Sequence, residues 1–341
     1  MLIRFAASAP LRLNKPDFDH INNVFDELGP IPRLCLDYDA KALSDYRRAL
    51  SNALSNLTTK KLECLVGAAK SLQMDASGAK NLGMDTVSNK ICLIRRLNPT
   101  DIADDEVEVL PITAIVGSRI AFQLRNTERS EQIRLYQQLT ALPGSKRLSG
   151  NVFEAYCQQR FSERILIKFV PMVRQEDSKA PKNKCRYLHQ WYTCNTELTP
   201  PSLEKARKAA LEERTSLDIR PLSSFEFISP KQTGRKLKVE PDVYYTPAAP
   251  NQDRFDSFII HDGILYLFQF TNATTHGIKD FFDFFANCTG YPARNNWRFI
   301  FVIPSDTETA MTCPVPATNA LRKLALYSAE VAVTMKQKYI S

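Results

Sequence analysis

The chain has 341 residues, of which 44% are hydrophobic, so it can bury a sizeable core, and its length favours two domains over one. No apolar run reaches the roughly 18 residues of a membrane-spanning helix, and the N-terminus lacks the apolar stretch of a secretory signal. The formal net charge of +8 favours polyanionic partners, nucleic acid first. We therefore expect a protein of the cell interior that binds no membrane, while its oligomeric state stays open.

Cysteine and histidine are too sparsely placed for the usual zinc centres. The eight cysteines are scattered from Cys35 to Cys313 without a C-x-x-C pair, and the chain has only four histidines. We expect free thiols in a reducing compartment.

The first third of the chain is predicted to be helical and then strand-like. Apolar residues recur at helical spacing over 41–74, with a break near NLTTKK, which indicates two helices. Strand-like runs follow over 90–97 and 107–124, and a polar helix is predicted near 128–141.

The last third of the chain alternates between strands and helices. Strands are predicted over 223–230, 242–245 and 297–305, and helices over 278–288 and 317–333. This alternation indicates an α/β fold in which helices cover both sides of a mixed sheet.

A hairpin is the most specific local signal in this region. Asp262-Gly263 separates two apolar runs, 255–261 and 264–270, and a two-residue type I′ turn favours this dipeptide because both of its central positions need positive φ. We expect the two runs to pair as antiparallel strands.

Each strand of the hairpin carries a polar residue where a buried strand is apolar. In the expected register Asp256 lies directly opposite Gln269, and Thr271 shares their face. A buried carboxylate needs a cation or several donors. One interpretation is an Asp–Gln hydrogen bond that fixes the register. The other is a site where oxygen ligands hold Mg²⁺ against a phosphodiester.

The order helix, strand with Asp, turn, second strand, helix resembles the PD-(D/E)XK nuclease superfamily. More narrowly, "DSFII…LYLFQFTNATTHGIK" looks like the C-terminal domain of Crinkler and retrotransposon-hot-spot (RHS) proteins of fungi, oomycetes and trypanosomes. The likeness is best over 223–305 and extends back to about 147. It implies a restriction-endonuclease-like mixed sheet flanked by helices, and a Mg²⁺-dependent endonuclease or nuclease-derived DNA-binding effector of the nucleus. The alternative is a catalytically inactive effector or protein-interaction domain that retains the fold.

The resemblance assigns roles to three oxygen-bearing side chains. Asp256 matches the metal ligand of the first strand, Gln269 the D/E position, and Glu154, within 147–161, the acidic residue of the opening helix. All three would hold Mg²⁺. For Glu154, a solvent-facing helix position is the alternative.

The sequence departs from the family pattern at the lysine. Thr271 stands two residues after Gln269, where an ammonium group would stabilise developing negative charge. Lys279 and His276 are the nearest candidates for that charge, and Lys279 is included among the expected catalytic residues. Glutamine in place of an acid also removes one negative charge from the metal site.

A basic run over 231–238, KQTGRKLK, is the expected nucleic-acid interface. A solvated loop is the alternative. The residues expected to contact phosphates are Lys231, Arg235, Lys236 and Lys238.

The front of the chain carries a second resemblance. The stretch "FDELGPIPRLCLD" (25–37) resembles the lid of the P-loop ATPase that precedes the nuclease-like domain in Crinkler and RHS proteins, with Arg33 at the phosphate-facing position. No G-x-x-x-x-G-K-[ST] loop is present, so no ATP site is expected in this chain. The expected domains are a helical lid remnant (1–85), a connecting β region (86–124) and the nuclease-like domain (125–341).

Overall fold

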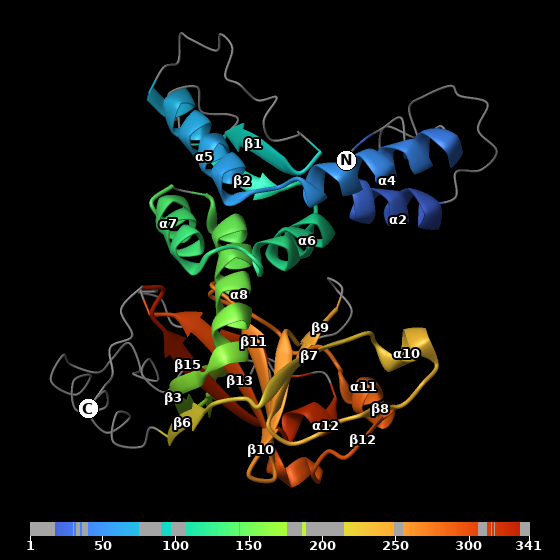
Figure 1. Ribbon diagram of the computed structural model, residues 1–341, viewed down its shortest axis with the longest axis vertical. Helices are drawn as coiled ribbons and strands as arrows, with labels where there is room; N and C mark the ends of the chain where they lie inside the picture. Colours follow the sequence, from blue (N-terminus) through green and yellow to red (C-terminus); the bar gives the residue numbers. More distant parts are fainter. Residues whose placement is uncertain are drawn as a thin grey trace, which may run out of the picture. The chain divides into compact units, whose positions relative to one another are not determined.

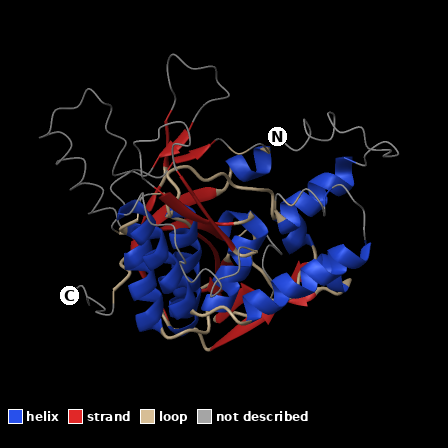
Figure 2. Ribbon diagram, turned by 90° about the horizontal axis from the view of Figure 1, so that it is seen from above, coloured by secondary structure: helices blue, strands red, loops and turns tan. Residues whose placement is uncertain are grey.

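The chain divides into two compact units, Met1–Val152 and Phe153–Ser341, and the boundary falls inside helix α8 (Lys146–Glu163). The first unit is mainly helical and the second is built on strands (Figure 1). Figure 2 distinguishes the helices and strands of the chain by colour. The computed structural model describes residues 18–29, 31, 35, 40–74, 90–96, 107–142, 144–175, 186–188, 215–248, 255–305, 312–314, 316 and 318–334.

The first unit confirms the predicted helix pair and corrects the strand-like run that follows it. The run over 107–124 is a strand only as far as Pro111, because Thr113 begins a helix by accepting a hydrogen bond from the Val116 N–H at 3.1 Å. The C-terminal part of the predicted β region at 86–124, from Ala114 to Leu124, is therefore the helix α6. Arg33, expected at an ATPase lid, lies outside the described residues. The elements of this unit are α2 (Phe18–Leu28), α4 (Ala40–Ser55), α5 (Thr59–Met74), β1 (Cys92–Arg96), β2 (Val107–Pro111), α6 (Ala114–Leu124) and α7 (Arg129–Thr140).

The second unit is organised around a mixed sheet of eight strands, in the order β6-β3-β15-β13-β11-β10-β9-β7. The pairs β11–β13, β13–β15 and β7–β9 are parallel, and the other pairs are antiparallel. The strands are β3 (Ile165–Pro171), β6 (Thr215–Ile219), β7 (Ser223–Phe227), β9 (Val243–Pro247), β10 (Ser257–His261), β11 (Ile264–Phe270), β13 (Trp297–Pro304) and β15 (Ala325–Val331). The predicted α/β class with a mixed sheet is confirmed.

Smaller elements complete this unit. A three-stranded sheet has the order β14-β5-β4, and β8 pairs with β12. Their bounds and those of the short helices are β4 (Val173–Gln175), β5 (Arg186–Leu188), α10 (Pro230–Thr233), β8 (Leu237–Lys238), α11 (Phe282–Ala286), β12 (Cys288–Thr289), η4 (Arg294–Asn296), β14 (Thr312–Pro314) and α12 (Asn319–Arg322).

Two predicted helices are wrong in extent. The helix expected over 317–333 ends at Arg322, and the rest of the segment is β15, which pairs with β13 and β3 inside the sheet. Pairing on both sides outweighs the helical preference of its alanine and leucine residues. The helix expected over 278–288 is helical only at Phe282–Ala286.

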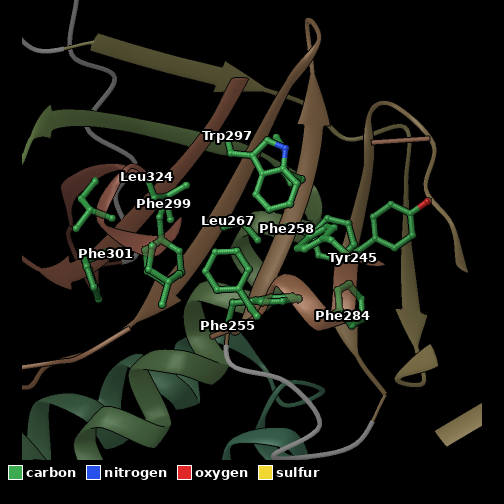
Figure 3. Packing of buried hydrophobic residues seen from close by; sticks show 14 of the residues in the cluster. Tyr245, Phe255, Phe258, Leu267, Phe284, Trp297, Phe299, Phe301 and Leu324 are labelled. Atoms are coloured by element: carbon green, nitrogen blue, oxygen red, sulfur yellow. The ribbon is translucent and has the colours of Figure 1, made fainter. Parts of the chain in front are cut away.

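Helices pack on both faces of the sheet. On one face, Phe161 of α8 lies edge-on to Phe268 and Phe270 of β11, with ring centroids 5.2 Å apart in each pair. On the other face, Phe284 of α11 packs against Phe258 of β10, with ring centroids 6.0 Å apart. Figure 3 shows this second layer, where aromatic side chains fill the space between α11 and the strands. The sheet is thus held between α8 and α11.

Candidate active site

The predicted hairpin is confirmed. β10 and β11 pair antiparallel from Ser257↔Phe268 to His261↔Ile264. Asp262 and Gly263 at the turn have φ values of 49° and 71°. These are the positive angles that a type I′ turn requires, which explains why the dipeptide set the register correctly.

A β-bulge at the start of β10 changes the expected position of Asp256. The Asp256 N–H donates to Phe268 O at 2.9 Å, although Ser257 is the ladder partner of Phe268. Two residues of one strand therefore face one residue of the other. Phe255 and Phe258 accordingly reach the same core, with ring centroids 5.7 Å apart. The predicted direct opposition of Asp256 and Gln269 in the ladder is wrong by this one inserted residue.

The Asp256 side chain nevertheless meets Gln269. Gln269 Nε2 donates to Asp256 Oδ2 at 2.7 Å, and the Phe270 N–H donates to the same oxygen at 2.6 Å. Burial raises the pKa of the Asp256 carboxyl group to about 7, and these two hydrogen bonds lower it only in part. The carboxylate is thus enclosed, oriented by two donors, and half ionised near neutral pH.

Helix α8 brings Glu154 towards this carboxylate through a residue that the sequence reasoning missed. Gln158 is only 5% exposed, and its Nε2 lies 3.4 Å from the main-chain oxygen of Asp256 and 3.3 Å from Glu154 Oε1. The pKa of Cys157 reflects the same arrangement. Burial is the main cause that raises this pKa, and the negative charges of Asp256 and Glu154 raise it further. The spacing of Glu154 and Gln158, one helical turn apart, was the available signal.

Thr271 and the two residues expected to replace the missing lysine follow β11 in the chain. Thr271 is buried just beyond β11, where its hydroxyl oxygen accepts from the Ala273 N–H at 3.0 Å. Lys279 is exposed and precedes α11, and within the described part of the chain no hydrogen bond or ion pair joins it to Asp256. Burial lowers the pKa of His276, and the positive charge of Lys279 lowers it further.

The predicted nucleic-acid interface forms α10, a turn and β8. Arg235 and Lys236 are exposed, and Lys238 is also exposed and pairs with Glu240 at 3.1 Å. Lys231 belongs to α10, and its side chain lies outside the described part. The described cations of this basic loop (235–238) therefore face solvent, where a phosphate backbone can reach them.

The oxygen atoms around Asp256 would suit a metal site in which water and substrate fill part of the coordination shell. Among the residues that the structure describes, no group of three or more His, Cys, Asp or Glu side chains is arranged to hold a metal ion. The cluster offers two carboxylates, Asp256 and Glu154, and the amide oxygen of Gln269. Mg²⁺ is commonly held by one or two carboxylates, with water and substrate phosphate completing its shell. Asp256, Glu154 and Gln269 carry oxygen atoms of the kind that such a centre uses.

Comparison with known proteins leaves the family open. The chain matches no protein-family model, and no match was found among curated proteins or among solved structures. The likeness to PD-(D/E)XK nucleases and to Crinkler and RHS proteins therefore rests on the motifs quoted above. As for membranes, no helix within the described ranges combines the length and apolarity of a bilayer crossing.

Proposed function

We propose that the second unit is a Mg²⁺-dependent nuclease module of the PD-(D/E)XK type that acts on nucleic acid, with DNA as the leading substrate. The observation that carries the proposal is the bulge that directs a buried carboxylate toward Gln269, at the carboxyl end of β11. Bulges commonly re-aim side chains beside active sites. In open α/β sheets, ligands bind outside the carboxyl ends of parallel strands.

Each side chain of the cluster has a distinct role in this proposal. Asp256 and Glu154 would hold Mg²⁺, and Gln269 would add its amide oxygen while its nitrogen orients Asp256. Gln158 would position Glu154 and Asp256 relative to each other. Bound Mg²⁺ polarises a phosphodiester and lowers the pKa of a coordinated water.

Protonation of Asp256 gives the proposal a definite pH dependence. Its carboxyl group, with a pKa of about 7, must lose a proton before it can bind a metal ion. Mg²⁺ affinity and cleavage should therefore increase as the pH rises through neutrality. Lys279 is proposed as the cation beside the scissile phosphate, and the basic loop would hold the substrate backbone.

The test is cleavage of plasmid DNA, single-stranded DNA and RNA, with Mg²⁺ and with EDTA. Asp256→Asn should abolish Mg²⁺-dependent cleavage while sparing nucleic-acid affinity, since affinity comes mainly from the basic loop. Gln269→Glu should tighten Mg²⁺ binding by restoring a negative charge. Lys279→Ala should slow cleavage.

Asp262→Asn provides a matched control. It makes the same chemical change in the same hairpin, but at the exposed turn, where asparagine also suits type I′ geometry. Cleavage that survives Asp256→Asn at the parental rate would rule out this site.

The second candidate is a nucleic-acid-binding or protein-interaction domain that has lost the chemistry. Thr271 in place of the lysine favours it, and so do the hydrogen bonds of Asp256 Oδ2, which by themselves explain the carboxylate as a support for the bulge. If neither the parent protein nor Gln269→Glu cleaves any substrate while binding persists, this candidate is the correct one.

A further inference from the structure

A second polar site lies at the opposite end of the parallel strands from Asp256. A pocket of about 470 Å³ opens beside the amino-terminal ends of β13 and β15. Arg294 and Asn295 line it from the turn before β13, and Asn319 and Lys323 line it from the segment before β15. Phe282 of α11 forms part of its wall. Asp256 lies at the carboxyl end of β11, and none of the residues of its cluster lines this pocket.

The lining of this pocket carries positive charge without a compensating acid. Arg294 and Lys323 are its charged members, both are exposed, and no carboxylate lines the pocket. Within the described ranges, neither cation forms an ion pair with an Asp or Glu side chain. Asn295 and Asn319 add amide groups that donate hydrogen bonds. Two unpaired cations with amide donors at one concave site favour a phosphate or carboxylate ligand.

Arg294 also offers a flat surface. Its guanidinium group lies 4.3 Å from the centroid of the Phe282 ring, so the arginine is stacked on the wall of the pocket. Phe282 is held in turn by Trp297, with ring centroids 5.8 Å apart. A guanidinium plane fixed on one face can accept a planar ring on its other face.

We propose that this pocket binds a free mononucleotide or an equivalent small phosphorylated aromatic compound. The ring would stack on Arg294, and the phosphate would meet Lys323 with the amides of Asn295 and Asn319. The volume lies within the roughly 300–1,000 Å³ typical of small-molecule sites. The proposal does not depend on the nuclease function, since it uses none of the residues around Asp256.

The test is calorimetric titration of the full chain with 5′-AMP, 5′-UMP, adenosine and inorganic phosphate. Both nucleotides should bind more tightly than adenosine or phosphate alone, because only they engage both halves of the pocket. Lys323→Ala should weaken nucleotide binding by roughly tenfold or more, through the lost phosphate contact. Arg294→Lys keeps the positive charge but removes the planar guanidinium group. It should therefore weaken nucleotide binding and leave phosphate binding unchanged.

Arg220→Ala is the control. Arg220 is an exposed arginine just after β6 that does not line the pocket, so this variant should bind nucleotides like the parent. Circular dichroism would establish that each variant is folded. Absence of binding at millimolar nucleotide, or unchanged affinity in folded Arg294→Lys and Lys323→Ala, overturns the proposal. Equal affinity for phosphate and nucleotide overturns the stacking role of Arg294. Tighter binding of a 5′-phosphorylated oligonucleotide than of 5′-AMP would show a strand-end site instead.

Discussion

Replacing Asp256 by asparagine should make the protein more stable at pH 8, and the gain should shrink as the pH falls. Burial raises the pKa of this carboxyl group from 3.8 to about 7, so the folded state keeps its proton over a range in which the unfolded state has lost it. Between those two values the folded state binds more protons. The stability of the parent therefore decreases as the pH rises through this window. Asparagine keeps an acceptor for Gln269 and Phe270 and carries no charge, so it does not share this loss.

The magnitude follows from the size of the pKa change. Each pKa unit corresponds to about 1.4 kcal/mol, so the full change from 3.8 to about 7 amounts to about 4 kcal/mol of lost stability in the parent at pH 8. At pH 4 the same relation gives a loss of stability of under about 1 kcal/mol in the parent, because the folded state is then protonated and the unfolded state is protonated in part. The free-energy difference between Asp256→Asn and the parent should therefore grow by about 3–4 kcal/mol over this range.

Urea unfolding at a series of pH values measures this difference. The chain has two tryptophans, so a Trp191→Phe background leaves Trp297, which is buried in the second unit, as the only tryptophan reporter. If the difference between Asp256→Asn and the parent does not change with pH, Asp256 does not titrate with a raised pKa, and the argument for an enclosed carboxylate fails. Adding Mg²⁺ at pH 8 should stabilise the parent and leave Asp256→Asn unchanged, because only the ionised carboxylate binds the ion.

Three further predictions concern other parts of the molecule. Gly290→Ala should destabilise the protein by roughly 2–4 kcal/mol in urea unfolding, because φ is +88° and an added Cβ would lie 2.3 Å from a main-chain oxygen; Gly263→Ala, at φ +71° with open space, should lose only about 1 kcal/mol. Comparable losses for both would contradict the steric argument. Phe258→Ala should lose about 3–5 kcal/mol in the same assay, because Phe258 is fully buried among aromatic rings, and a loss under about 1 kcal/mol would contradict that packing. Joint replacement of Arg235 and Lys236 by glutamate should weaken DNA binding and lower its salt dependence, measured by fluorescence anisotropy, and an unchanged salt slope would place the interface elsewhere.

The sequence was sufficient where local chemistry determines structure. Asp262-Gly263 specified the turn and therefore the register of β10 and β11, because few dipeptides tolerate two successive positive φ angles. The bulge beside Asp256 was not predicted, since a strict period of two was assumed along the strand. Phe255 and Phe258, three residues apart and both apolar, were the sign that one residue had been inserted.

The sequence was insufficient where distant segments decide the outcome. Residues 325–331 have a composition that suits a helix, yet they form β15 because β13 and β3 lie on either side to pair with them. Gln158 looked like a polar helix position, and only the packing of α8 against the sheet buries it beside Asp256. The link from Glu154 through Gln158 to the hairpin depends on that same packing, so spacing along the chain could suggest it only by analogy.

The position of β15 has a consequence for how the second unit is made. It is the last strand that the structure describes, yet it lies between β3, more than 150 residues earlier, and β13 (Figure 1). During synthesis, β3 and β6 leave the ribosome long before the strand that joins them to the rest of the sheet. Until residue 331 has emerged, β3 and β13 each present an unpaired edge, which makes the nascent chain prone to aggregation. Closure of the sheet is therefore expected to be a late and slow step in folding, because it depends on contacts between segments far apart in the chain.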